Sequence, residues 1–285
     1  MPELPEVETV RRRLVPVLVG RRLDRVAIGD PRLVRPRDPA EAAAELEGET
    51  VAALERRGKY LVVRFERDLV LLIHLRMTGS LQHAPGGRLE DDPHLRAVVT
   101  LDDGSDVIYR DVRRFGTWEP FDAAGAAAHL AVRLGPEPLG RAFTPSFLSS
   151  RLDGRSTPVK AAILDQRTVA GLGNIYADEA LWHAGIHPLR PAGELRRDES
   201  KALRDAVREA LLRGIGWGGT DLGDGVIDAA GVSELKAYGR GGEPCERCGT
   251  PIARAVVSGR GTWFCPRCQG RTARRSRSVL PRSHL

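Results

Sequence analysis

The chain has 285 residues, enough for two domains, and its 41% hydrophobic content is typical of a folded protein. It contains no run of about eighteen apolar residues, which excludes a membrane-spanning helix. The start Met1–Glu6 is acidic and proline-rich, whereas a signal peptide needs a basic start and an apolar run. We therefore expect a cytoplasmic protein with no membrane partner.

The net charge of +6 is unevenly distributed along the chain. From Lys236 to Leu285 there are eleven Lys or Arg residues against two Glu, a local charge of +9, which leaves −3 for the preceding residues. A basic end on a near-neutral body favours a polyanionic partner, because binding releases condensed counterions. A solubilising surface is the alternative that charge alone leaves open.

The first predicted element is a helix from about Glu3 to Val15. Val7, Val10 and Leu14 recur at helical spacing and form one apolar stripe. Acidic residues precede basic ones along this segment, as the helix dipole favours. Pro16 is expected to end the helix or to kink its last turn.

A β-rich region follows, with short runs of Val, Leu and Ile separated by turn sequences such as Asp103-Gly104. Several antiparallel strands at such short spacing predict a β-sandwich. The expected strands comprise residues 61–65, 69–74, 97–101 and 106–109.

The alanine-rich and then proline-rich stretch from about Ala123 to Pro145 is predicted to be a linker. Three helices are predicted after it, at residues 159–165, 174–184 and 199–215. The glycine-bearing turn Val169–Gly173 would join the first two of them, as in a helix-turn-helix motif.

The four cysteines form two CxxC pairs that are sixteen residues apart: Cys245 with Cys248, and Cys265 with Cys268. Each pair can turn two sulfurs toward one point, and two pairs complete a tetrahedral thiolate site for zinc. Such a closed site is structural, because it leaves no position open for a substrate. The alternative is a redox-active CxxC pair, which does not account for two matched pairs. We therefore expect one structural Zn²⁺.

Residues 258–262, between the two cysteine pairs, are predicted to form the tip of a hairpin that presents Arg260 between two glycines. An arginine in this position can grip a phosphate through two hydrogen bonds while the backbone approaches closely. A solvated turn arginine is the alternative when the hairpin is considered alone.

Pro2 becomes the N-terminus if Met1 is removed, and its nitrogen is then a secondary amine with a pKa of about 8. Attack of this amine on an aldehyde-level carbon gives an iminium ion, which acidifies the adjacent carbon. On deoxyribose this chemistry would expel the base and then eliminate the phosphate. Glu3 and Glu6 lie beside the amine and can act as general acid or base. The alternative is that these residues only initiate a helix.

The assembled motifs resemble those of the formamidopyrimidine-DNA glycosylases, a family related to endonuclease VIII. The resemblance follows the chain in order from Met1 to about Gln269. The matching segments are Met1–Val10, Gly58–Leu61, His74–Leu81, Asp111–Gly116, Leu134–Leu139, Gly171–Ala177, Tyr238–Arg240 and the four-cysteine ribbon.

The resemblance implies a DNA-repair enzyme that removes oxidised purines, such as 8-oxoguanine and formamidopyrimidines, from duplex DNA and then cuts the abasic site by β,δ-elimination. Pro2 would be the Schiff-base nucleophile, and Glu3 would protonate the deoxyribose ring oxygen. Lys59 would donate a proton during β-elimination, and Arg260 would grip the phosphate and assist δ-elimination. The implied DNA contacts around the damaged nucleotide are Lys59, His74, Asn174, Tyr238 and Arg260, with His94 and Arg155 outside them.

Met77, Arg113 and Phe115 match the residues that fill the gap left when the damaged nucleotide flips out. Flipping costs a few kcal/mol of stacking, of which an apolar plug recovers part. Arg113 only donates hydrogen bonds and suits the acceptor edge of cytosine, which favours a purine lesion. The alternative for Met77 and Phe115 is core packing, against which their charged neighbours in expected hairpin tips argue.

The predicted fold is α+β, with an N-terminal helix, an antiparallel β-sandwich, a helix-two-turn-helix domain and a four-cysteine zinc ribbon. The tail is predicted to be disordered and to add non-specific affinity for DNA. The expected units are the β-sandwich domain (1–130), a linker (131–145), the helix-two-turn-helix domain (146–236), the ribbon (237–269) and the basic tail (270–285).

The sequence departs from the family pattern at three places. Arg76 stands where many members have Gly, and Val112 stands where many have Pro. The loop from about Gly218 to Ser233 is rich in Gly and Asp, is shorter than the family's lesion-capping loop, and has no aromatic residue after Trp217. These departures concern the choice of lesion and not the chemistry at Pro2.

Three other interpretations remain to be weighed. A non-enzymatic DNA-binding protein on the same scaffold would need neither Pro2 nor Glu3. An enzyme for oxidised pyrimidines is disfavoured by the match at the gap-filling residues. A generic zinc-ribbon interaction protein leaves everything before Tyr238 unexplained. We therefore expect a monomer that acts on damaged double-stranded DNA and is associated with the nucleoid when bound.

Overall fold

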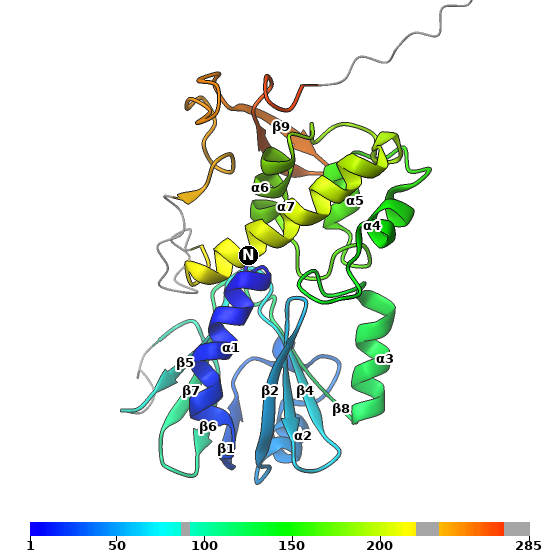
Figure 1. Cartoon of the computed structure of the whole chain (residues 1–285). Coiled ribbons are helices and arrows are strands. Elements are labelled where there is room, and N and C mark those ends of the chain that lie inside the picture. Colours follow the sequence, from blue (N-terminus) through cyan, green and yellow to red (C-terminus); the bar gives the residue numbers. More distant parts are fainter. Residues whose placement is uncertain (87–91, 221–233, 271–285) are drawn as a thin grey trace, which may run out of the picture.

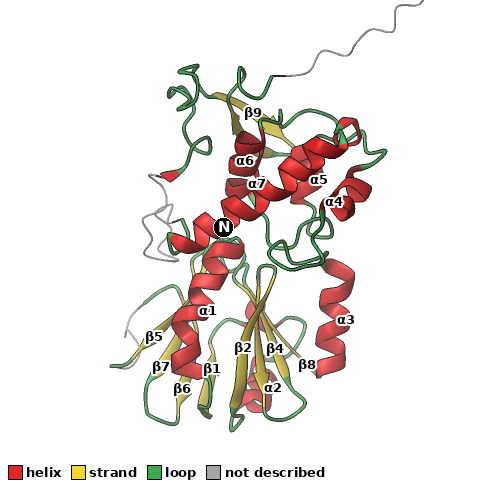
Figure 2. Cartoon of the chain, in the orientation of Figure 1, coloured by secondary structure: helices red, strands yellow, loops and turns green. Residues whose placement is uncertain are grey.

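The computed structural model describes residues 1–86, 92–220 and 234–270. A β-sandwich occupies one end of the molecule and a helical domain with a two-stranded ribbon the other, and the amino terminus lies where they meet (Figure 1). Strands are confined to the sandwich and the ribbon, which confirms the α+β class (Figure 2). The basic tail and most of the 218–233 loop lie outside the described residues. Within the described ranges, no helix is long and apolar enough to cross a membrane.

Helix α1 (Leu4–Leu18) begins directly after Glu3, whose backbone N–H donates to the Glu6 carboxylate at 2.8 Å. The predicted helix is confirmed; of the two outcomes expected at Pro16, an end of the helix is wrong, because the helix continues to Leu18. Pro16 is exposed, so water can reach the carbonyl that its missing N–H leaves unpaired. Burial of Leu18 in the core holds the extra turn in place.

Two four-stranded antiparallel sheets form the sandwich. Their strands are β1 (Leu23–Ile28), β2 (Val51–Arg57), β3 (Tyr60–Phe65), β4 (Val70–His74), β5 (Gly79–Ala84), β6 (Leu95–Leu101), β7 (Asp106–Asp111) and β8 (Thr117–Phe121). The sheet orders are β1-β6-β7-β5 and β2-β3-β4-β8. The predicted strands are confirmed as β3, β4, β6 and β7. The sequence does not predict the other four, because polar residues interrupt their apolar runs.

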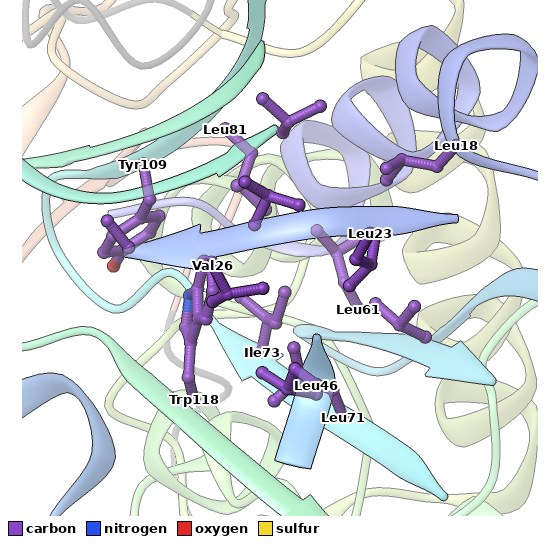
Figure 3. Close-up of a cluster of buried hydrophobic side chains, with 14 of the residues drawn as sticks. Leu18, Leu23, Val26, Leu46, Leu61, Leu71, Ile73, Leu81, Tyr109 and Trp118 are labelled. Carbon is purple, nitrogen blue, oxygen red and sulfur yellow. The ribbon is translucent and has the colours of Figure 1, made fainter. Parts of the chain in front are cut away.

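The sandwich core lies between the two sheets and beneath α1 (Figure 3). Tyr109 and Trp118 fill it from opposite sheets, with their ring centroids 5.6 Å apart. Leu61 and Ile73, on neighbouring strands, are buried in the same core. Each such side chain contributes about 1.5–3 kcal/mol when it is withdrawn from water. The short helices η1 (Pro31–Val34) and α2 (Pro39–Leu46) follow β1.

The predicted linker of residues 123–145 is wrong in its first half. Residues Ala123–Arg133 form helix α3, in which the Asp122 carboxylate caps the first turn by accepting from the Gly125 N–H at 2.5 Å. Alanine is the strongest helix former, which explains why this alanine-rich run forms a helix instead of the predicted linker. Ala126 packs against the outer face of the sandwich. Residues 134–144 form the irregular connection to the second domain.

The helical domain contains α4 (Pro145–Leu152), α5 (Val159–Leu164), α6 (Asn174–Ala184), the short η2 (Ala192–Glu194) and α7 (Arg197–Gly216). Helices α5, α6 and α7 confirm the three predicted helices to within two residues at each end. Helix α4 was not predicted. Its signal is Thr144, whose hydroxyl accepts from the Phe147 N–H at 3.1 Å, followed by a proline in the first turn.

The ribbon is the antiparallel hairpin of β9 (Ala253–Val257) and β10 (Arg260–Phe264), which packs against α6. Ser258 and Gly259 form its tip with φ of +50° and +74°. The predicted hairpin is confirmed, and Arg260 is the first residue of its second strand rather than part of the turn.

Candidate active site at the junction of the two domains

The start of α1 docks against the glycine-bearing turn between α5 and α6. The Leu4 N–H donates to the Gly171 carbonyl at 3.0 Å, and Gly171 has a φ of +84°. A Cβ at this position would lie 2.7 Å from the Leu4 Cβ, so a larger residue would push the helix away. Pro2 is buried, and Figure 1 shows that the chain begins where the sandwich meets the helical domain.

The Glu3 carboxylate lies against the first turn of α6. One oxygen accepts from the Ile175 N–H at 2.9 Å and the other from the Tyr176 N–H at 3.4 Å. The side chain is 1% exposed, and the helix N-terminus favours its negative charge. A Cβ on Gly173 would lie 2.2 Å from the Glu3 carboxyl carbon. The glycine therefore makes room for the carboxylate beside Pro2.

Glu6 is a second buried carboxyl beside Glu3. It accepts hydrogen bonds from the Tyr176 hydroxyl and the Thr220 N–H, both at 2.8 Å, in addition to the Glu3 N–H. Burial raises the pKa of Glu6 to about 7, and the neighbouring Glu3 charge adds to the rise. Sequence reasoning placed Glu6 near the amine. It did not reveal Tyr176 or Thr220, because tertiary packing alone brings them to this carboxyl.

Lys59 lies in the Gly58-Lys59 turn between β2 and β3, directly before Tyr60, and is 6% exposed. Burial lowers the pKa of Lys59, and Arg260 lowers it further, whereas the charges of Glu3 and Glu6 raise it. Lys59 of the sandwich, the carboxyls of Glu3 and Glu6, and Arg260 of the ribbon are therefore close enough to interact electrostatically. The structure thus brings together predicted residues from both domains.

The turn that carries Lys59 is fixed by Glu137 of the interdomain connection. Glu137 accepts from the Gly58 N–H at 2.6 Å and from the guanidinium groups of Arg56 and Arg57 at 2.9 Å each. Gly58 has a φ of +58°, which favours glycine. The connection between the domains therefore positions Lys59 as well as joining the two parts.

The hairpin of Arg260 is held by a buried ion pair of Lys160 and Asp178, 2.7 Å apart. The Lys160 ammonium also donates to the Gly261 carbonyl at 3.0 Å, and Asp178 accepts from the Trp263 N–H at 3.0 Å. The predicted DNA contact Asn174 donates to the same Gly261 carbonyl at 3.0 Å. Sequence reasoning missed Lys160 and Asp178. Their only signal is a charged residue on an otherwise apolar helix face.

His74 ends β4 and is buried, with its ring edge against Tyr60 at a centroid distance of 4.7 Å. Burial lowers the pKa of His74 to about 3, and the charges of Arg76 and Lys59 lower it further. Its Nδ1 accepts from the Arg76 N–H at 3.0 Å, so the neutral ring carries its proton on Nε2. The ring can therefore donate a hydrogen bond from Nε2.

Tyr238 is positioned by the buried Glu179 carboxylate. Glu179 accepts from the backbone N–H groups of Lys236, Ala237 and Tyr238 at 2.8–2.9 Å. The Tyr238 ring packs on Trp263 with centroids 4.5 Å apart. Burial raises the pKa of Tyr238, so its phenol stays protonated and can donate.

The predicted gap-filling residues lie on two neighbouring loops of the sandwich. Met77 is half-buried on the β4–β5 loop, and Phe115 is 52% exposed on the β7–β8 loop. The Arg113 guanidinium lies 4.9 Å from the Phe115 ring centroid. The exposure of Phe115 contradicts the alternative of core packing for this residue.

His94 and Arg155, the expected outer contacts, lie on other loops. The His94 carbonyl accepts from the Asp111 N–H at 3.0 Å, which places His94 beside the start of the β7–β8 loop. Arg155 lies between α4 and α5, 3.9 Å from Asp165. Both are half-exposed and accessible to a large ligand.

The four cysteine sulfurs lie within 4.8 Å of one another, and none forms a disulfide. A tetrahedral site with Zn–S bonds of about 2.3 Å requires sulfurs about 3.8 Å apart. The Cys245–Cys268 distance of 4.0 Å and the Cys248–Cys265 distance of 3.5 Å fit this requirement. The four thiolates hold one structural zinc ion, which anchors the base of the ribbon.

The fold and the site together define a protein in which a β-sandwich, a helical domain and a zinc ribbon close around an N-terminal proline. Three family models match in chain order. They are the formamidopyrimidine-DNA glycosylase N-terminal domain at residues 1–118, the formamidopyrimidine-DNA glycosylase H2TH domain at 134–224 and the zinc finger found in FPG and IleRS at 242–270.

Two relatives match over nearly the whole chain. The formamidopyrimidine-DNA glycosylase of Symbiobacterium thermophilum is 48% identical, with 94% of this chain and 89% of the relative covered. That of Geobacillus kaustophilus is 47% identical, with 94% and 100% covered. The chain therefore belongs to the formamidopyrimidine-DNA glycosylase family.

Solved structures with DNA agree with this assignment. The Lactococcus lactis protein bound to DNA with an abasic site has a TM-score of 0.88 and 37% identity, with 94% of this chain and 100% of that chain covered. MutM in complex with DNA containing carbocyclic 8-oxo-G has a TM-score of 0.89 and 38% identity, with 95% and 100% covered.

Proposed function

We propose that this chain excises oxidised purines from duplex DNA, with Pro2 as the nucleophile, and then cleaves the backbone at the abasic site. The family consists of DNA glycosylases that also act as abasic-site lyases in base-excision repair. Its structures include complexes with Fapy-dG and carbocyclic 8-oxo-G. The protein would act as a monomer in the cytoplasm, associated with the nucleoid while bound to DNA.

The observation that carries the proposal is the position of Glu3. Its carboxylate is buried next to Pro2, held by the first N–H groups of α6, and close enough to Lys59 to affect its pKa. A carboxylate that only caps a helix would need neither the space that Gly173 leaves for it nor a buried lysine beside it. This arrangement supports acid–base chemistry at the chain terminus.

The first step needs the free Pro2 amine, which is exposed when Met1 is removed. The nitrogen attacks C1′ of the damaged nucleotide, and the bond from C1′ to the base breaks. The base leaves with the electron pair and takes up a proton, while Glu3 protonates the ring oxygen and opens the sugar. The product is an iminium ion that joins Pro2 to the open sugar.

Strand cleavage follows from the positive charge of the iminium. Loss of the C2′ proton expels the 3′ phosphate, and loss of the C4′ proton then expels the 5′ phosphate. Lys59 has a lowered pKa and can exchange protons during the first elimination. Arg260, the first residue of β10, would bind the departing phosphate and assist the second elimination.

The remaining predicted residues would hold the DNA. His74, Asn174 and Tyr238 would contact the phosphates around the damaged nucleotide, and His94 and Arg155 would contact the backbone further out. Met77, Arg113 and Phe115 would fill the gap in the duplex. The proposed units are the sandwich domain (1–130), a linker (131–145), the helical domain (146–236) and the ribbon (237–269); the family models match at 1–118, 134–224 and 242–270, so the second model also includes most of the proposed linker.

An oxidised pyrimidine is a second candidate substrate. A complex of the Lactococcus lactis protein with DNA containing an oxidised pyrimidine has a TM-score of 0.88 and 37% sequence identity to this chain. The acceptor edge that suits Arg113 belongs to cytosine, which pairs with guanine, so the purine remains the preferred lesion.

Borohydride trapping tests the function. Met1-processed protein is mixed with duplexes that carry 8-oxoguanine opposite cytosine, an oxidised pyrimidine, or an abasic site, and Pro2→Gly serves as the control. We expect a covalent adduct on the 8-oxoguanine duplex that is lost or strongly reduced in the control. An adduct on the oxidised pyrimidine alone would overturn the lesion preference. No adduct on any duplex would favour a DNA-binding protein that has lost its activity.

A further inference from the structure

The two loops that carry the gap-filling residues are joined by one buried carboxylate. Asp111, the last residue of β7, is 1% exposed. One of its oxygens accepts from the Thr78 hydroxyl at 2.5 Å and from the Arg113 N–H at 3.2 Å. The other oxygen accepts from the Gly116 N–H at 2.8 Å. Asp111 thus contacts the β4–β5 loop once and the β7–β8 loop at both ends.

The Thr78 hydroxyl completes a closed triangle with this carboxylate. It accepts from the Arg113 N–H at 3.0 Å while it donates to Asp111. One hydroxyl therefore links the residue that follows Met77 to the backbone of Arg113. We call the three groups of Thr78, Asp111 and Arg113 the loop clasp.

Packing leaves the clasp little freedom to rearrange. A Cβ on Gly116 would lie 1.6 Å from the Tyr109 hydroxyl and 3.2 Å from an Asp111 oxygen. The Asp111 carbonyl accepts from the Arg96 side chain at 2.9 Å. The β7–β8 loop is therefore held against the sandwich core on the side opposite its exposed residues.

An outer ion pair fixes the middle of the β7–β8 loop. Arg114 has a φ of +59°, a backbone conformation that costs a non-glycine residue about 1–2 kcal/mol. Its guanidinium donates to the buried Asp30 carboxylate at 2.5 and 2.9 Å. Arg114 thus turns back toward the sandwich, while its neighbours Arg113 and Phe115 remain exposed.

We propose that the loop clasp makes Met77, Arg113 and Phe115 enter the duplex as one rigid unit, with Thr78 and Asp111 as positioning residues. This inference rests on the proposed function, because it concerns how the damaged nucleotide is exchanged for protein side chains. Insertion between stacked bases needs side chains that are already ordered, since ordering two free loops would add to the cost of unstacking. When the loop clasp joins the two loops, they become ordered as the protein folds. The cost of ordering them is then not added to the cost of insertion into the duplex.

The test removes the Thr78 hydroxyl without changing the shape of the side chain. Thr78→Val breaks the link between the loops and leaves the Asp111 bonds to Arg113 and Gly116 in place. Thr78→Ser keeps the hydroxyl and serves as the rescue. Thr100→Val is the matched control, because the Thr100 hydroxyl donates to Asp106 at 2.7 Å within the same sheet, away from both loops.

Two rates are measured for each variant under single-turnover conditions. The first is excision from a fully paired duplex, with a 2-aminopurine next to the lesion to report insertion. The second is excision of the same lesion placed in an unpaired bulge, where little unstacking is needed. Thermal unfolding of each variant is recorded in parallel.

We expect Thr78→Val to slow insertion and excision in the paired duplex about tenfold, the effect of one lost hydrogen bond to a charged group. Excision of the lesion in the bulge by Thr78→Val should be slowed less than twofold. Thr78→Ser and Thr100→Val should keep the wild-type ratio of the two rates, although Thr100→Val loses stability.

A Thr78→Val protein that keeps the wild-type ratio, or that is slowed equally on both substrates, would overturn the loop clasp. The proposal would also be overturned if Thr78→Val and Thr100→Val had equal ratios of the excision rate in the paired duplex to that in the bulge. Failure of the proposed function is distinguishable, because wild-type protein would then form no borohydride adduct on either substrate.

Discussion

Gly173 offers a direct test of how the site is built, because it faces the side chain of Glu3. Its φ of −129° is accessible to any residue, so the backbone alone does not require glycine. A Cβ at this position would lie 2.2 Å from the Glu3 Cδ and 2.4 Å from its Oε1. Gly173→Ala must therefore displace the carboxylate from the N–H groups of Ile175 and Tyr176.

The expected cost follows from two contributions. Overpacking a buried site costs about 1–3 kcal/mol of unfolding free energy. Replacing a helix N-cap glycine by alanine adds about 0.5–1 kcal/mol. Gly173→Ala should thus destabilise the wild-type chain by about 2–4 kcal/mol. In a Glu3→Ala background the clash is gone, and the same substitution should cost about 1 kcal/mol or less.

The assay is a double-mutant cycle on the holoprotein, with the free energy of unfolding of all four proteins measured in urea. The two substitutions should show a coupling energy of about 2 kcal/mol. The yield of borohydride trapping on an abasic duplex should fall in Gly173→Ala, because the displaced Glu3 carboxylate no longer lies beside the Pro2 nitrogen. An equal cost of Gly173→Ala in both backgrounds would refute the reasoning, because the clash would not involve Glu3.

Three further predictions concern proton binding, zinc and backbone strain. Burial raises the pKa of Glu6 to about 7 from 4.5, so the folded chain keeps a proton that the unfolded chain releases; this contribution is complete below about pH 4.5 and is lost as the pH rises through about 7. The melting temperature of Glu6→Gln should therefore fall less than that of the wild type as the pH rises through about 7. An unchanged pH dependence of the melting temperature would contradict this prediction. Chelation of zinc should weaken binding to duplex DNA at least about tenfold in fluorescence anisotropy, with recovery on adding Zn²⁺ and not Mg²⁺, because the metal anchors the hairpin of Arg260; unchanged affinity of metal-free protein would show that the hairpin holds without it. Arg76 has a φ of +56°, so Arg76→Gly should raise stability by about 1 kcal/mol in thermal unfolding, whereas Arg25→Gly in extended β1 should lower it; a loss at both positions would rule out the backbone explanation.

Local patterns predicted much of the fold. The helical spacing of Val7, Val10 and Leu14 predicts α1, and the glycine turn before Asn174 predicts where α6 begins. The CxxC spacing predicts the metal site, because those ligands are close in sequence. Each of these signals lies within a short stretch of the chain, at most the 24 residues from Cys245 to Cys268, where geometry is set largely by the chain itself.

Residues that act through tertiary contacts could not be predicted in this way. Lys160 and Asp178 are each a charged residue on an otherwise apolar helix face, and this signal alone does not indicate that the two form a buried ion pair. Thr78 and Asp111 belong to recognised motifs, but no spacing rule indicates that they touch. Glu137 lies about eighty residues from the turn it holds. Folding creates these contacts, so no spacing rule in the sequence predicts which residues form them.

Five carboxylates around the site share one role, which is to hold the backbone close to residues proposed to act on DNA. Each accepts at least one backbone N–H from a residue that is proposed to act on DNA or lies within three residues of one, so part of its negative charge is used inside the protein. An amide substitution at such a position would keep the size and alter the hydrogen bonding, so it should misplace the neighbouring residue rather than simply reduce repulsion of DNA. The pairs are Glu3 with Ile175, Glu137 with Gly58, Glu179 with Tyr238, Asp178 with Trp263 and Asp111 with Arg113.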